Sequence, residues 1–340
     1  MLNLILLNFF LIFLSVFFYQ KSNKIARKFN LFDRPDGLRK IHKTNMPLLG
    51  GPIITLISLI NILFYWDQFS FLFLISFCLS IIFIFILGIY DDLKNLGAIK
   101  KLIISSLIIG VFLIFNDHLV IETIKFSSFE KKISLGFWSV PFTILCFLLV
   151  QNSLNMSDGI DGLFGTISIA VCISILFYNY DKNFFTFSFL IILVIHLIIF
   201  LFFNFTKKTF MGDSGVYVLS FLISVFLIDT YIKKGYSYFG IQFQTEQIFA
   251  ILFLVGFDMF RVFLFRLSLK KNPFLSDKNH LHHFLILKMS SKKVCFIYLF
   301  NILTITFLIN LFPTKTLIIY LLNFMIYFLL LLFSRFKLVN

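Results

Sequence analysis

Charged residues are scarce in this chain of 340 residues. They make up 14% of the sequence, and only 16 side chains are acidic. Soluble domains carry about a quarter charged and roughly 45–50% apolar residues, whereas 59% of the residues here are hydrophobic. This shortage of charge excludes an ordinary soluble domain and indicates a membrane protein.

Cysteine is scarce as well. The four cysteines, Cys78, Cys146, Cys172 and Cys295, lie inside apolar runs and form no CxxC pair. They read as small buried hydrophobic residues, which argues against a disulfide framework or a zinc site. The N-terminal apolar run lacks a basic region and a small-residue cleavage site, so it predicts a retained first span.

Long apolar runs, by contrast, are abundant. A helix needs about 20 apolar residues to cross the hydrocarbon layer, and eleven runs approach that length. We therefore predict an all-α polytopic membrane protein with about eleven transmembrane helices. It forms one domain over residues 1–340 and has no internal repeat. The predicted spans are residues 2–19, 48–66, 69–89, 102–116, 135–151, 164–179, 185–205, 216–232, 247–265, 294–311 and 316–333.

The connectors between these spans alternate between two sides of the membrane. One side has about three times as many Lys and Arg residues as the other, which places it in the cytoplasm. The N-terminus is then outside and the C-terminus cytoplasmic. The same bias accounts for the net charge of +14, so we expect no nucleic-acid partner. The cytoplasmic loops are residues 20–47, 90–101, 152–163, 206–215 and 266–293, followed by the C-terminal tail.

Polar clusters occur in or beside these cytoplasmic loops, and the first is DRPDGLRKIHKTNMPLLGGP at residues 33–52. Arg39, Lys40 and His42 suit either a charge anchor among lipid headgroups or a cationic wall that binds phosphates. The Gly50-Gly51 pair permits another backbone to approach closely.

The second cluster is GIYDDL, residues 88–93. The adjacent carboxylates of Asp91 and Asp92 repel each other unless a cation or a proton relieves the repulsion. On a helix they point about 100° apart, so one simple salt bridge does not serve both. Lys94 and Lys101 lie nearby, and a structural ion-pair cap is the alternative interpretation.

The third cluster, NSLNMSDGIDGLFG, holds Asn152, Asn155, Asp158 and Asp161. If the chain re-enters a helix here, the two acids are three residues apart and share one face. Asn and Gly are also ordinary turn residues. Capping alone explains one of the acids, however, and not both.

The fourth cluster is FMGDSG, residues 210–215, preceded by Asn204. GDSG also surrounds the nucleophile of some serine proteases, but no His/Asp partner frame accompanies it here. The carboxylate of Asp213 suits a hard cation such as Mg²⁺. A plain helix N-cap is the alternative.

The fifth cluster is SDKNHLHHF, with His280, His282 and His283. These residues lack the i, i+4 spacing of helical zinc ligands and have no accompanying cysteine. Hydrogen bonding to phosphate oxygens is favoured over a solvated polar face. The preceding span contributes Asp258, Arg261 and Arg266.

Acids alone would suggest a cation site, and a cation-coupled transporter is the alternative from another functional class. Transporters place such groups near the bilayer midplane within paired repeats, whereas these clusters lie at one face. Acids beside many cations indicate Mg²⁺ with phosphates, which phosphoryl transfer requires. Ionisable groups at a bilayer are costly and usually functional.

In this order the motifs resemble those of the polyprenyl-phosphate N-acetylhexosamine-1-phosphate transferases. The resemblance covers RKIH with PLLGG, GIYDDL, NxxNMSDGIDGL, FMGDSG and HLHH, from about residue 33 to 284. It implies transfer of a HexNAc-1-phosphate from a UDP-sugar to undecaprenyl phosphate, with release of UMP. Such a reaction starts a lipid-linked cell-envelope glycan on the cytoplasmic face of the plasma membrane. A homodimer is compatible with it.

The resemblance also implies residue roles. Asp213 and Asp92 would hold Mg²⁺, for which Mn²⁺ is a substitute, and Asp91 with Asp92 would be catalytic. The remaining residues would contact the substrates: Arg39, Lys40, His42, Lys101, Asn152, Asn155, Asp158, Asp161, Asn204, His280, His282 and His283.

Two departures from the family pattern bear on the branch. Asn95 stands where a further Asp often occurs, which puts a third carboxylate in that motif in doubt. HLHH replaces three consecutive histidines, which favours an N-acetylglucosamine-type enzyme over a phospho-N-acetylmuramoyl-pentapeptide transferase. The CDP-alcohol phosphotransferases are excluded, because Asp158-Gly159 is not followed by their Ala-Arg pair.

Overall fold

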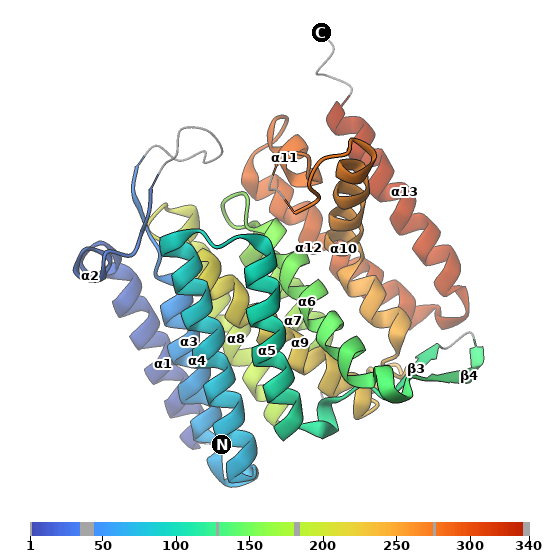
Figure 1. Cartoon of the computed structure of the whole chain (residues 1–340), viewed down its shortest axis with the longest axis horizontal. Coiled ribbons are helices and arrows are strands. Elements are labelled where there is room, and N and C mark those ends of the chain that lie inside the picture. The colour runs from blue at the N-terminus through green and yellow to red at the C-terminus, as the bar shows by residue number, and fades with distance from the viewer. Residues whose placement is uncertain (1, 35–43, 127–128, 180–183, 275–276, 336–340) are drawn as a thin grey trace. The chain divides into compact units, whose positions relative to one another are not determined.

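The computed structural model describes residues 2–34, 44–126, 129–179, 184–274 and 277–335, and they are predominantly helical (Figure 1). Each predicted span corresponds to a helix. These helices are α1 (Leu2–Gln20), α3 (Gly50–Phe64), α4 (Phe71–Lys94), α5 (Ala98–Phe115), α6 (Ser139–Ser157), α7 (Leu163–Leu176), α8 (Phe184–Phe205), α9 (Gly212–Ile232), α10 (Thr245–Ser268), α12 (Ser291–Leu311) and α13 (Thr316–Arg335).

Within the described ranges, nine helices are long and apolar enough to cross a membrane. The other two helices that match predicted spans, α3 and α7, have 15 and 14 residues and are shorter than a full span. The all-α polytopic fold is thus confirmed. The exact number of spans and the sidedness stay predictions.

Smaller elements connect the spans. The chain adds the short helices α2 (Ser22–Phe29) and α11 (Leu281–Ile286). Two antiparallel hairpins pair β1 (Phe32–Asp33) with β2 (Met46–Pro47), and β3 (Thr123–Phe126) with β4 (Phe129–Ser134). The second hairpin lies in a connector for which the sequence predicted no structure.

The described chain packs as two compact units. Unit 1 comprises residues 1–118 and 185–222, and unit 2 comprises residues 119–184 and 223–340. The acidic motifs GIYDDL and FMGDSG therefore belong to unit 1. The NSLNMSDGIDGLFG and HLHH motifs belong to unit 2.

Helix α4 illustrates how a largely apolar helix selects its inner face. Its buried positions recur every three or four residues, whereas its exposed positions are large and apolar, as expected of a surface that meets lipid. The buried stripe ends in a charged residue, and its members include Phe77, Ile81, Ile84, Gly88 and Asp91.

Unit 2 is held partly by polar pairs between apolar helices. Ser174 on α7 lies 3.1 Å from the Thr306 hydroxyl on α12, and Asn310 on α12 donates to the Tyr178 hydroxyl at 2.5 Å. Such interhelical hydrogen bonds stabilise packing where burial of apolar surface cannot, because lipid is itself apolar.

Candidate active site

The end of α4 and the start of α9 meet at Gly88 in unit 1. A Cβ placed on Gly88 would lie 2.3 Å from Ser214 Cα and 2.6 Å from Ser214 N. Only a glycine permits two backbones to approach this closely. The glycine of GIYDDL therefore brings this motif onto FMGDSG.

The segment PLLGG also packs on FMGDSG. The amides of Gly50 and Gly51 donate to the carbonyls of Phe210 and Met211 at 3.0 and 2.9 Å. A Cβ on Gly51 would lie 2.3 Å from Ser214 Oγ. The predicted close approach at this glycine pair is confirmed. Arg39, Lys40 and His42, which precede the pair, lie outside the described residues.

Asp92 caps α9 from a neighbouring helix. Its Oδ1 accepts from the amide of Asp213 at 2.8 Å, and its Oδ2 accepts from the amide of Ser214 at 3.1 Å. Gly212 adopts a left-handed backbone with φ of 74°, and a Cβ there would lie 2.8 Å from Asp92 Oδ2. The first amides of a helix need such acceptors. The alternative interpretation of Asp213 as the N-cap is thus wrong, because Asp92 takes that role.

Asp91 is buried, and three neutral or basic groups contact its carboxylate. Lys101 forms an ion pair with Oδ2, the Tyr217 hydroxyl donates to the same oxygen at 2.7 Å, and the Leu96 amide donates to Oδ1 at 2.8 Å. A buried carboxylate needs this degree of compensation. The sequence predicted Lys101 near Asp91 but missed Tyr217. The available signal was its spacing of four residues from Asp213, which places both on one face of α9.

Asp213 completes the acidic cluster, by which we mean Asp91, Asp92 and Asp213. Its carboxyl group, in the first turn of α9, interacts with the other two carboxylates and with Lys101. The structure thus brings these three acids of unit 1 together, and their roles stay predictions.

The acidic cluster has the hard oxygen donors that Mg²⁺ prefers. Both oxygens of Asp92 already accept backbone amides, so Asp213 is the better placed ligand. Among the described residues, no three His, Cys, Asp or Glu side chains are arranged to hold a metal ion by themselves. A bound ion would therefore need further oxygens from water or from a substrate.

Asn204, predicted to contact substrate, supports the FMGDSG loop. It is buried, and its amide donates to the carbonyl of Thr209 at 3.0 Å. Thr209 in turn donates to the carbonyl of Pro47 at 3.1 Å. The observed contact of Asn204 is thus with the backbone that leads into the acidic cluster.

In unit 2, helix α6 ends at Ser157 and α7 begins at Leu163. Residues 158–162 form a turn, in which Gly162 has φ of 82°. The condition for Asp158 and Asp161 to share one helical face, a helix that covers both, is therefore not met. Asp158 is exposed, and Asp161 is half-buried in the same turn.

The two asparagines of this motif lie on the last turns of α6. Asn152 donates to the carbonyl of Leu148 at 2.7 Å, which ties its amide to its own helix. Asn155 is half-buried, and its carbonyl accepts from the amide of Asp158 at 3.2 Å. Both therefore flank the turn, and their contact with substrate stays a prediction.

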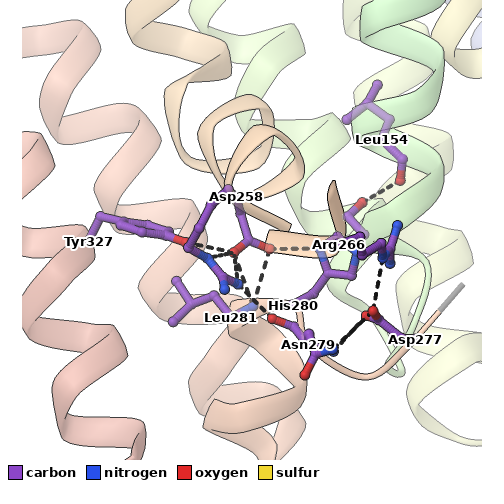
Figure 2. Close-up of polar contacts among 10 residues, drawn as sticks. Leu154, Asp258, Arg266, Asp277, Asn279, His280, Leu281 and Tyr327 are labelled. Carbon is purple, nitrogen blue, oxygen red and sulfur yellow. Dashed lines mark hydrogen bonds and ion pairs between the residues drawn. The ribbon is translucent and has the colours of Figure 1, made fainter. Parts of the chain in front are cut away.

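The histidine cluster, namely His280, His282 and His283, surrounds the start of α11. His280 is buried at the N-cap position, and its Nδ1 lies 2.9 Å from Oδ2 of Asp258 on α10. Figure 2 shows Tyr327 and Leu281 on the same carboxylate. The sequence placed Asp258 on the approach to the histidines without identifying this contact.

His282 and His283 face the turn after α6. A Cβ on Gly159 would lie 2.6 Å from His282 Nε2 and 3.1 Å from His283 Nε2. Burial lowers the pKa of His282 well below its ordinary value and lowers that of His283 to about 4, so both are neutral at pH 7. His283 is half-buried, whereas His282 is buried, so His283 is the more accessible of this pair.

Comparisons with known proteins identify the family. The profile of glycosyl transferase family 4 matches residues 74–231. The undecaprenyl-phosphate alpha-N-acetylglucosaminyl 1-phosphate transferase of Thermotoga maritima is 31% identical over 299 residues, covering 85% of this chain and 86% of that protein. The chain belongs to the polyprenyl-phosphate N-acetylhexosamine-1-phosphate transferase family.

The relatives of this chain bear more than one name. The phospho-N-acetylmuramoyl-pentapeptide-transferase of Petrotoga mobilis is 31% identical over 312 residues, covering 87% of this chain and 93% of that protein. The undecaprenyl-phosphate alpha-N-acetylglucosaminyl 1-phosphate transferase of Escherichia coli K12 is 26% identical over 273 residues, covering 78% of this chain and 71% of that protein. The protein is therefore an enzyme of this transferase family, and the names of its relatives do not select one branch.

A polar loop precedes the HLHH motif of this transferase. Arg266 on α10 donates to Asp277 at 2.9 Å and to the carbonyl of Pro273 at 2.7 Å. Asp277 also accepts from the amide of Asn279 at 2.9 Å. These bonds determine the path of the chain into the histidine cluster (Figure 2).

Proposed function

We propose that this enzyme transfers a HexNAc-1-phosphate, N-acetylglucosamine-1-phosphate in the first place, from a UDP-sugar to undecaprenyl phosphate and releases UMP. The observation that carries the proposal is the convergence of Asp91, Asp92 and Asp213 at the start of α9, beside Lys101. Relatives whose names state such transfers to undecaprenyl phosphate support it.

The central physical problem of this reaction is repulsion between an anionic nucleophile and an anionic diphosphate. We propose Asp213 as the ligand of a Mg²⁺ ion, with Mn²⁺ as a substitute. When bound, the ion supplies charge neutralisation on the phosphate oxygens. Lys101, which Asp91 holds in place, supplies a fixed positive charge of the protein itself.

The contacts of Asp91 and Asp92 support roles in arranging charge. A phosphate monoester has a second pKa of about 6, so a general base is helpful without being essential. Asp91 orients Lys101 and Tyr217, and Asp92 holds the backbone that carries Asp213. Both residues therefore act in catalysis by arranging charge.

We assign recognition of the donor to unit 2. His283 and the turn around Asp158 and Asp161 offer hydrogen-bonding groups for a phosphate, a sugar or a nucleotide. The HLHH spacing favours N-acetylglucosamine as the sugar of the donor. The phospho-N-acetylmuramoyl-pentapeptide donor is the second candidate, because a phospho-N-acetylmuramoyl-pentapeptide-transferase is as similar to this chain, at 31% identity, as the N-acetylglucosaminyl 1-phosphate transferase.

The Lys and Arg bias supports a multi-pass enzyme in the plasma membrane whose active site is on the cytoplasmic face. The product is a lipid-linked diphospho-sugar, on which a cell-envelope glycan begins. A homodimer stays a prediction.

Release of UMP tests the function directly. Purified enzyme in detergent is supplied with Mg²⁺, undecaprenyl phosphate and either UDP-N-acetylglucosamine or UDP-N-acetylmuramoyl-pentapeptide. We expect UMP with the first donor, and loss of turnover and of its Mg²⁺ dependence in Asp213→Asn. The matched control is Asp67→Asn, which changes an exposed acid outside the acidic cluster. No UMP from any UDP-HexNAc donor would refute the proposal.

A further inference from the structure

Asp258 is a buried carboxylate on α10 on which four residues converge. Its Oδ1 accepts from Arg261 Nη2 at 2.8 Å and from the Tyr327 hydroxyl at 2.7 Å. Its Oδ2 lies 2.9 Å from His280 Nδ1, and the amide of Leu281 donates to both oxygens at 3.2 and 3.1 Å. Only 4% of Asp258 is exposed, so these partners replace water around its charge.

This arrangement determines which nitrogen of His280 carries a proton. Arg261 forms an ion pair with Asp258, so the carboxylate is charged and can only accept hydrogen bonds. The Nδ1 atom of His280 must then be the donor. In the neutral ring, the Nε2 atom is left with its lone pair, and a carboxylate partner of this kind also fixes the orientation of the ring.

The same carboxylate anchors α11. The side chain of His280 makes no capping bond at this helix, so Asp258 serves as the acceptor for the Leu281 amide. The His280 ring stacks on His282 with centroids 5.7 Å apart and planes 10° apart, and His282 lies 4.2 Å from His283. The orientation of one ring therefore constrains the next two.

In the row of histidine rings, His282 has a nitrogen that is available to a ligand. The Nε2 atom of His282 is buried and has no hydrogen-bond partner among the described residues. Gly159 lies directly against it and against His283. An unpaired buried nitrogen is costly unless a ligand satisfies it, so the orientation of these rings matters for binding.

We propose that Asp258 is a positioning residue for donor recognition. It holds His280 in the Nδ1-protonated form and anchors α11, so that His282 and His283 present their Nε2 edges at the Asp158–Gly162 turn. Asp258 itself does not touch substrate. The identity of the donor, a UDP-sugar, rests on the proposed function, whereas the state of His280 does not.

Steady-state kinetics provide the first test. In Asp258→Asn, we expect the KM for UDP-N-acetylglucosamine to rise on the order of 10- to 100-fold, as for other residues that orient a binding group. The KM for undecaprenyl phosphate should stay unchanged. A variant that is merely less folded would lose kcat and keep both KM values. An unchanged donor KM in folded Asp258→Asn would overturn the proposal.

The matched control is Asp229→Asn, a carboxylate-to-amide change on α9. Asp229 is buried to a similar degree and pairs with Lys233 at 2.8 Å, one helical turn away. We expect this variant to retain the wild-type KM for both substrates. A donor KM that rises equally in both variants would assign the effect to general loss of buried charge and would contradict a specific role for Asp258.

Nitrogen-15 NMR of histidine-labelled protein provides a test that needs neither activity nor a folded variant at Asp258. In the wild type, we expect the His280 resonances, assigned by their absence in His280→Gln, to show a protonated Nδ1. A protonated Nε2 with a bare Nδ1 would refute the positioning role and leave the proposed function standing. A wild type that shows the expected tautomer but releases no UMP would refute the function alone.

Discussion

The backbone amide of Asp213 donates a 2.8 Å hydrogen bond to the carboxylate of Asp92, so one acid of the cluster holds the main chain of another. The bond couples the end of α4 to the start of α9. The dipole of α9 also favours a negative charge at its N-terminus. The interaction therefore stabilises both the charged form of Asp92 and the helix. Removing either motif therefore disturbs both.

Asp92→Asn should weaken this cap. An amide can accept one of the two N–H groups but offers its own NH₂ to the other, so we expect a loss of about 0.5–2 kcal/mol of stability, typical of a lost helix cap. Turnover should fall as well, because Asp213 moves with the loosened turn. Thermal unfolding and UMP release measure the two effects, with Asp67→Asn as the control. Wild-type values for both in Asp92→Asn would contradict the capping role.

Gly88→Ala should be severely destabilising. The added Cβ would lie 2.3 Å from the backbone of Ser214, which cannot move aside as a side chain can, so we expect a loss of more than about 3 kcal/mol. Gly256→Ala on α10 is the matched control, because no atom lies within 4 Å of its Cβ and alanine suits a helix interior better. Thermal unfolding of both variants in detergent tests this prediction, and equal midpoints would show it to be wrong.

Gly159→Ala should affect donor binding more than stability. The new Cβ would lie 2.6 Å from His282 Nε2, and the atoms it meets are the ends of side chains rather than backbone. The rings should shift, so we expect the KM for the UDP-sugar to rise at least about tenfold, as for other disturbances of an orienting group. Gly97→Ala, where a Cβ meets nothing within 4 Å, serves as the control. Unchanged donor kinetics in Gly159→Ala would separate this turn from the donor site.

Stability of the ligand-free enzyme should decline as the pH falls below about 6.5. The ordinary histidine pKa is about 6.5, and burial holds that of His283 at about 4 and that of His282 well below its ordinary value. At a pH between the folded and unfolded pKa values, these histidines bind protons in the unfolded chain but stay neutral in the folded chain. Protonation therefore favours unfolding. This contribution is fully present above pH 6.5 and is lost progressively towards pH 4.

Thermal unfolding between pH 7.5 and 5 measures this decline. His283→Gln should show a shallower slope, because one of the two groups is removed. His118→Gln, which changes an exposed histidine in the Asp117–Leu119 turn, should retain the wild-type slope. Identical slopes in all three proteins would place the pH dependence elsewhere.

The transmembrane fold was predictable because length and hydropathy suffice to find a span in lipid. The ends of the helices were less so. Helix α4 continues to Lys94, past the predicted end at residue 89, because Asp91 extends its buried stripe and is compensated by Lys101, a partner that hydropathy does not register. The hairpin of β3 and β4 escaped prediction because its strands of four and six residues are too short to stand out.

For the site, the sequence identified the acids and histidines but not the residues that hold them. Tyr217 and Tyr327 lie within apolar spans that each contain a second tyrosine, and only the rotation of each helix reveals that their hydroxyl groups reach Asp91 and Asp258. The turn at residues 158–162 was not predicted, because spacing alone cannot show that α6 ends at Ser157 or that Gly162 has a left-handed backbone at the start of α7.

The bond between Asp92 and Asp213 also orders the biogenesis of the enzyme. The two residues are 121 positions apart, so the ribosome delivers α4 to the membrane long before the amides that Asp92 will accept have been made. A partly inserted chain must therefore carry Asp92 without these amide partners at the edge of the bilayer, whereas Asp91 already has Lys101 beside it. The acidic cluster can assemble only when the nascent chain has returned to that edge with α9.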